Sequence, residues 1–132
     1  MSDATAGEVR ATKVLVIDDS NTIRRSAEIF LKQGGYDVVL AEDGFDALAK
    51  VSDHQPDLIF CDILMPRLDG YQTCAIIKRN PHFANVPVIM LSSKDGLFDK
   101  ARCRMVGSED YLTKPFTKDQ LLQAVEQHRV TA

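Results

Sequence analysis

Near its start the chain reads Lys13-Val14-Leu15-Val16-Ile17-Asp18-Asp19, four apolar residues in succession followed by two acidic ones. An apolar run without alternation is typical of a strand covered on both faces, as in a parallel sheet. The acidic pair stands where that strand ends. This segment therefore predicts a buried parallel strand over residues 13–17 that carries two carboxylates to one edge of a sheet.

Working outward, the same alternation of apolar run and amphipathic stretch repeats along the chain. Further strands are predicted over Asp37–Leu40, Leu58–Cys61, Val88–Leu91 and Asp110–Thr113. Helices are predicted between them, with a first one ending at Gly34-Gly35, a second ending before Pro56, a third running through Ile76 and Ile77, and a fifth beginning after a capping box at Thr117–Gln120. Five such units in a row predict an α/β fold, a doubly wound parallel sheet with five helices.

The fourth helix is the least determined element. It is expected somewhere within residues 95–106, and two apolar stripes compete for its inward face. The residues that compose them are Leu97, Phe98, Ala101 and Met105.

Length and composition indicate one globular domain. The 132 residues carry a net charge of −3, with 45% apolar and 27% charged residues. We expect a domain over residues 13–128, flanked by a short flexible tail over 1–12 and a second tail over 129–132. Without a secretory signal or an apolar run of about 20 residues, a cytoplasmic protein that does not insert into membranes is expected. The negative net charge argues against nucleic-acid binding. The three scattered cysteines predict reduced, buried thiols.

Several polar residues follow directly after the predicted strands. They are Asp18, Asp19, Asp62, Ser92 and Lys114. In a doubly wound sheet, the carboxyl ends of the strands share the edge where ligands bind. A lone aspartate there is often only a helix cap, but three carboxylates at one edge repel each other and call for a cation. Oxygen ligands favour Mg²⁺, for which Mn²⁺ could substitute.

Such a site suits phosphoryl chemistry. With its charge offset by the metal, Asp62 can act as a carboxylate nucleophile and form an aspartyl phosphate. Lys114 would add a second positive charge and Ser92 a hydroxyl donor to the phosphoryl oxygens. The competing interpretation of Lys114 is an ordinary exposed lysine, which its place at the end of an apolar strand disfavours.

Four motifs together resemble the bacterial response-regulator receiver family over about residues 13–128. They are Val16-Ile17-Asp18-Asp19-Ser20, Asp62-Ile63-Leu64-Met65-Pro66, Leu91-Ser92-Ser93 and Lys114-Pro115-Phe116. The resemblance implies a flavodoxin-like (CheY-like) sheet of order 2-1-3-4-5. It also implies that Asp18 and Asp19 bind Mg²⁺ together with Asp62, that Asp62 is the phosphoacceptor and that Lys114 is essential.

The resemblance further assigns residues around the acceptor. The backbone carbonyl of Leu64 would be a metal ligand, and Ser92 would be the hydroxyl switch, with a serine where many members have threonine. Tyr111 would be an aromatic switch, against the plainer interpretation of a half-buried strand residue. The Lys114–Pro115 bond would be cis.

A finer resemblance is to stand-alone receivers that control type IV pilus twitching motility, through residues 43–50, 69–74 and 91–100. It implies a single-domain response regulator, not an enzyme with its own substrate, that is phosphorylated by a chemotaxis-type histidine kinase. Its output would be contact with a downstream protein, such as the pilus extension machinery, because no output domain follows the fifth helix. A monomer or weak dimer is expected. The alternative is a chemotaxis-type or other stand-alone receiver that acts as a phosphorelay intermediate.

Two rival classes fit less well. A phosphohydrolase of the haloacid dehalogenase class would carry a second aspartate two residues after the nucleophile, where this chain has Leu64. A flavin-binding electron carrier would need hydrogen-bond donors to the FMN phosphate after the first strand. This chain has Asp18 and Asp19 there, which would repel that phosphate.

Overall fold

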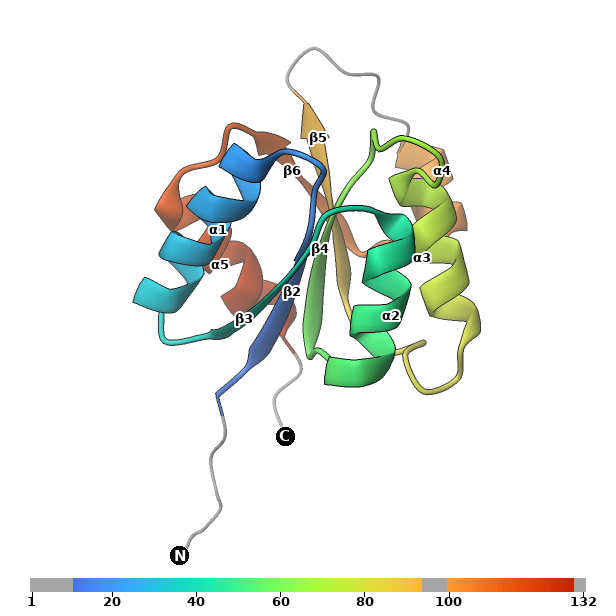
Figure 1. Ribbon diagram of the computed structural model, residues 1–132, viewed down its shortest axis with the longest axis horizontal. Helices are drawn as coiled ribbons and strands as arrows, with labels where there is room; N and C mark the ends of the chain where they lie inside the picture. The colour runs from blue at the N-terminus through green and yellow to red at the C-terminus, as the bar shows by residue number, and fades with distance from the viewer. Residues whose placement is uncertain (1–10, 94–99, 130–132) are drawn as a thin grey trace, which may run out of the picture.

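The computed structural model describes residues 11–93 and 100–129. In these residues a five-stranded parallel sheet forms the centre of the domain (Figure 1). Its strands are β2 (Lys13–Ile17), β3 (Asp37–Ala41), β4 (Leu58–Asp62), β5 (Val88–Ser93) and β6 (Asp110–Lys114). They lie in the order β3-β2-β4-β5-β6. Counted along the chain this is 2-1-3-4-5, so the predicted fold class is confirmed.

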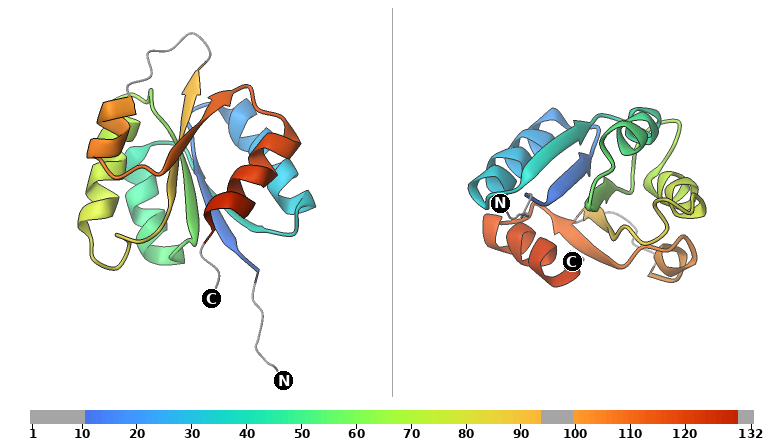
Figure 2. Two further views of the ribbon diagram at one scale, coloured as in Figure 1. Left: turned by 180° about the vertical axis from the view of Figure 1, so that it is seen from behind. Right: turned by 90° about the horizontal axis from the view of Figure 1, so that it is seen from below.

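Helices cover both faces of the sheet (Figures 1 and 2). One face is covered by α1 (Asn21–Gln33) and α5 (Lys118–His128), and the other by α2 (Gly44–His54), α3 (Gly70–Arg79) and α4 (Lys100–Met105). Each face has its own apolar core. The free thiols Cys61, Cys74 and Cys103 are all buried in the core beneath α2, α3 and α4.

Side-chain caps determine where the helices next to the carboxyl edge begin. The Ser20 hydroxyl accepts a hydrogen bond from the Ile23 backbone N–H at the start of α1. Thr117 and Gln120 form the predicted capping box at the start of α5. Because these caps satisfy backbone groups in the first turn, the turns that follow β2 and β6 have defined conformations.

The inward face of the fourth helix matches neither of the two predicted apolar stripes. Leu97 and Phe98 lie outside the described residues, Ala101 is exposed, and the Met105 side chain is 85% exposed. The residue of α4 that faces the core is Cys103. A helix of six residues is too short for hydrophobic periodicity to identify its inward face.

Most of the predicted tails, 1–12 and 129–132, also lie outside the described residues. Within the ranges 11–93 and 100–129, none of the helices has the length and apolar character needed to cross a bilayer.

Candidate functional site

Three carboxylates and one ammonium group meet at the carboxyl edge of the sheet. Carboxylate oxygens of Asp18, Asp19 and Asp62 all lie within 4.8 Å of one another. Lys114 Nζ donates to Asp18 Oδ2 at 3.1 Å and to Asp62 Oδ1 at 3.0 Å. Residues separated by up to 96 positions in the chain therefore form a single cluster.

Strand pairing places the two buried carboxylates. The Asp18 backbone N–H extends the pairing of β2 with β3 by donating to Ala41 O at 3.1 Å, and Asp18 Oδ1 accepts from Ser20 N at 2.9 Å. Asp62 is the last residue of β4 and pairs with Leu91 of β5. Asp18 and Asp62 are almost fully buried, whereas Asp19 is exposed.

Burial and mutual repulsion act on the protonation of this cluster. Burial, and after it the charge of Asp18, raises the pKa of Asp62 to about 7. Burial also raises the pKa of Asp18, although the Ser20 N–H and Lys114 act in the opposite direction. Burial alone would lower the pKa of Lys114, but the two carboxylates more than compensate and raise it. One ammonium group does not balance three carboxylates, so the cluster favours an additional cation.

The donor set fits a small hard divalent ion. Every side-chain atom that could bind a metal in this cluster is a carboxylate oxygen. Among the described residues, Asp18, Asp19 and Asp62 form the group with metal-binding geometry. Exposed Asp19 leaves one side of the cluster open to solvent. Mg²⁺ is characteristically held by one or two carboxylates together with waters and a phosphate oxygen. The residues present therefore fit Mg²⁺.

The other predicted residues lie around this cluster. Ser92, on the neighbouring strand β5, is 5% exposed, and its hydroxyl donates to Ser93 O at 3.3 Å. Leu64 lies two residues after Asp62, with its side chain 62% exposed. The role of its carbonyl as a ligand remains a prediction.

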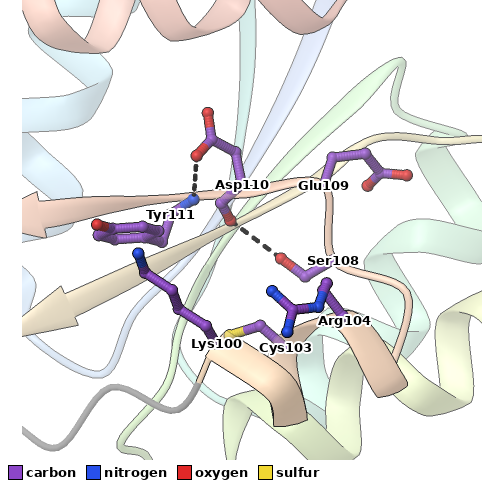
Figure 3. Close-up of a pocket in the computed structure, with 7 residues that line it drawn as sticks. All are labelled: Lys100, Cys103, Arg104, Ser108, Glu109, Asp110 and Tyr111. Atoms are coloured by element: carbon purple, nitrogen blue, oxygen red, sulfur yellow. Dashed lines mark hydrogen bonds between the residues drawn. The ribbon is translucent and has the colours of Figure 1, made fainter.

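Lys114 and Tyr111 lie at opposite ends of β6. The Lys114–Pro115 peptide bond is cis. The Tyr111 ring is 40% exposed and borders a hollow of about 240 Å³ between α4 and β6, with Lys100 Nζ 5.8 Å from its centroid (Figure 3). The hollow also borders Cys103 and Arg104 of α4. Tyr111 thus belongs to the surface between α4 and β6 and not to the carboxylate cluster.

Two contributors to the site were not predicted as such. A Cβ atom on Gly70 would lie 2.2 Å from Asp62 O, so only glycine allows α3 to begin this close to β4. Arg24, at the start of α1, donates from Nη1 to Asp18 O at 2.6 Å. The Asp69-Gly70 pair in the loop after the third predicted strand could have suggested the role of Gly70. The role of Arg24 leaves no signal in the sequence, because its acceptor is a backbone carbonyl.

Comparison with known proteins agrees with this geometry. Residues 14–126 match the response regulator receiver domain. The chain belongs to this family. The receiver match spans the five strands of the sheet except for Lys13, and it includes Asp18, Asp19 and Asp62. It confirms the resemblance predicted from the four motifs.

Individual proteins are similar to this chain in sequence or in structure. The protein PilG of Pseudomonas aeruginosa is 67% identical over 116 residues, which cover 88% of this chain and 86% of PilG. The alkaline phosphatase synthesis transcriptional regulatory protein PhoP of Bacillus subtilis is 40% identical over 105 residues, 80% of this chain and 43% of PhoP. The chemotaxis protein CheY4 of Vibrio cholerae superposes with a TM-score of 0.86 at 31% identity, covering 90% of this chain and 99% of CheY4.

Proposed function

We propose that this receiver is a single-domain response regulator that accepts a phosphoryl group on Asp62 from a histidine kinase. The observation that carries the proposal is the position of Lys114 Nζ, within hydrogen-bond distance of both Asp18 and Asp62. An ammonium group between two buried carboxylates would stabilise the negative charge of the transferred phosphoryl group. Membership of the receiver family supports the same reaction.

In this reaction an Asp62 carboxylate oxygen attacks phosphorus, and the bond from phosphorus to the histidine nitrogen of the donor breaks. Asp18, Asp19 and Asp62 would hold Mg²⁺, with the Leu64 carbonyl as a further ligand. When bound, the ion would neutralise charge on the carboxylates and on the phosphoryl oxygens. Lys114 would then move its hydrogen bond from Asp62 to a phosphoryl oxygen, and the Ser92 hydroxyl would donate to another.

Incubation with acetyl phosphate and Mg²⁺, followed by intact-mass measurement, tests the proposal. We expect a gain of one phosphoryl group that is absent when EDTA replaces Mg²⁺. Multiple turnover of acetyl phosphate without a persistent mass gain would instead indicate a phosphohydrolase. No mass gain and no turnover would contradict the proposal.

Asp19→Ala should weaken Mg²⁺ binding by about tenfold or more, because it removes a carboxylate that binds or orients the ion. Calorimetric titration of the unphosphorylated protein measures this. Asp37→Ala is a matched control, since it removes the same charge from an exposed residue at the opposite edge of the sheet. Equal affinities in the two variants would argue against the metal site.

We further propose that Ser92 and Tyr111 carry the signal to a protein partner. A phosphoryl group on Asp62 offers new acceptor oxygens, so the Ser92 hydroxyl should leave Ser93 O and move toward them. The space that it vacates would allow the Tyr111 ring to turn inward. Phosphorylation would thereby shift an existing equilibrium of the surface formed by α4, β6 and α5.

Ser92→Ala should keep phosphoryl uptake but lose most of the phosphorylation-dependent change in the Tyr111 amide signal in NMR spectra. The methyl side chain retains volume but cannot donate the hydrogen bond. Ser93→Ala, on the next residue of the same strand, should behave like the parent protein. If Tyr111 still responds fully in phosphorylated Ser92→Ala, Ser92 does not relay the signal.

The high identity to PilG supports a role in type IV pilus twitching motility. In that role the phosphodonor would be a chemotaxis-type histidine kinase in the cytoplasm, and the output would be contact with the pilus extension machinery. Deletion of the gene should abolish twitching, and a plasmid-borne copy carrying Asp62→Asn should fail to restore it. Normal twitching in the deletion strain would favour the alternative of a different stand-alone receiver.

A further inference from the structure

Arg24 stands at a position where the helix itself does not favour a cation. It is the fourth residue of α1, whose first turn contains no acidic residue. The positive end of the helix dipole disfavours cations near this end. The reason for an arginine here must therefore come from the contacts that its side chain makes.

Those contacts join the end of β2 to the start of α1. Arg24 Nη1 donates to Asp18 O at 2.6 Å, and Nη2 donates to Asn21 Oδ1 at 3.1 Å. The two nitrogens belong to one planar guanidinium, so both acceptors are held in a fixed relation. A lysine, with a single nitrogen, could not reproduce this fork.

The carbonyl that Arg24 holds belongs to the peptide unit between the two acidic residues. Because that unit is planar, fixing Asp18 O also fixes the direction in which the chain enters Asp19. Asp18 itself is further secured through its N–H to Ala41 O and through Oδ1 to Ser20 N. Asp19 is exposed, so the orientation of its carboxylate depends on this peptide plane more than that of the buried Asp18 does.

We infer that Arg24 is a positioning residue, which orients the Asp18–Asp19 peptide plane so that both carboxylates face the metal. The inference rests on the proposed Mg²⁺ site. The positive charge of Arg24 repels Mg²⁺ and by itself would weaken Mg²⁺ binding. The inferred positioning contact has the opposite effect, because tight binding requires it.

The sign of one measurement separates the two effects. In Arg24→Met the positioning contact is lost, and we expect the Mg²⁺ dissociation constant of the unphosphorylated full chain, measured calorimetrically with Mg²⁺ alone, to rise about tenfold. If Arg24 acted through charge alone, the same substitution would lower that constant. Arg25→Met is the matched control, because Arg25 carries the same charge next to Arg24 but is 74% exposed and pairs only loosely with Glu28, at 3.8 Å. It should bind Mg²⁺ at least as tightly as the parent.

A second pair of variants keeps the charge constant. Arg24→Lys should weaken Mg²⁺ binding severalfold, whereas Arg25→Lys should not, and this pair decides the question if Arg24→Met does not fold. Unchanged or tighter binding in the Arg24 variants would overturn the inference. Failure of the parent protein to bind Mg²⁺ would instead overturn the proposed function, so the two outcomes are distinguishable.

Discussion

Asp62→Asn should abolish phosphoryl uptake from acetyl phosphate. The amide has no carboxylate oxygen to attack phosphorus, so an acyl phosphate cannot form. The substitution is nearly isosteric, and Asp62 is only 3% exposed, so the surrounding fold should be retained. Intact-mass spectra should show full phosphorylation of the parent protein and none of the variant under the same conditions.

A matched substitution excludes a general effect of charge. Asp119→Asn removes one carboxylate from an exposed position in the first turn of α5 and should leave the rate of uptake unchanged. If Asp62→Asn still gains a phosphoryl group at the rate of the parent, the acceptor is another residue and the proposed role of Asp62 is wrong.

The same substitution should stabilise the metal-free protein above neutral pH. Folding raises the pKa of Asp62 from its ordinary value of 3.8 to about 7, so between these values the folded state binds more protons at this site than the unfolded state. The parent therefore loses stability as pH rises through this window. Asparagine stays neutral at every pH, so the variant does not incur this loss.

We expect the unfolding free energies of the variant and the parent to be similar near pH 4. The variant should become more stable by about 2–4 kcal/mol at pH 8, with the difference levelling off above pH 7. Urea denaturation in EDTA at a series of pH values measures this. Added Mg²⁺ should reduce the difference, because it stabilises the folded parent by binding. A variant less stable than the parent at pH 8 would mean that Lys114 more than offsets the repulsion between the carboxylates.

Much of the architecture could be predicted because its causes are local. The buried run before Asp18 is uniformly apolar, as a central parallel strand requires, and the capping box at Thr117 marks a helix start by residue type alone. The convergence of Asp18, Asp62 and Lys114 follows from topology, since parallel strands end at one edge. These features depend on the order of residues and not on the details of packing.

What the sequence left undetermined depends on contacts between distant segments. In α4 the Arg102 guanidinium lies 4.3 Å from the centroid of the Tyr71 ring on α3, while Met105 extends into solvent. The sequence of a six-residue helix predicts neither the contact of Arg102 with Tyr71 nor the exposure of Met105. Arg24 was equally hidden, because arginines at helix starts are commonly solvated and its acceptor is a backbone carbonyl.

The burial of every native thiol makes this chain well suited to site-specific labelling. Burial raises the pKa of Cys74 to about 12 and that of Cys61 well above its usual value, so both remain protonated and react slowly with maleimides. Cys103 borders the hollow between α4 and β6 but is only 5% exposed. A single cysteine introduced at Met105 would therefore take up a spin label or fluorophore selectively in the otherwise native sequence. The probe would report whether α4 moves on phosphorylation.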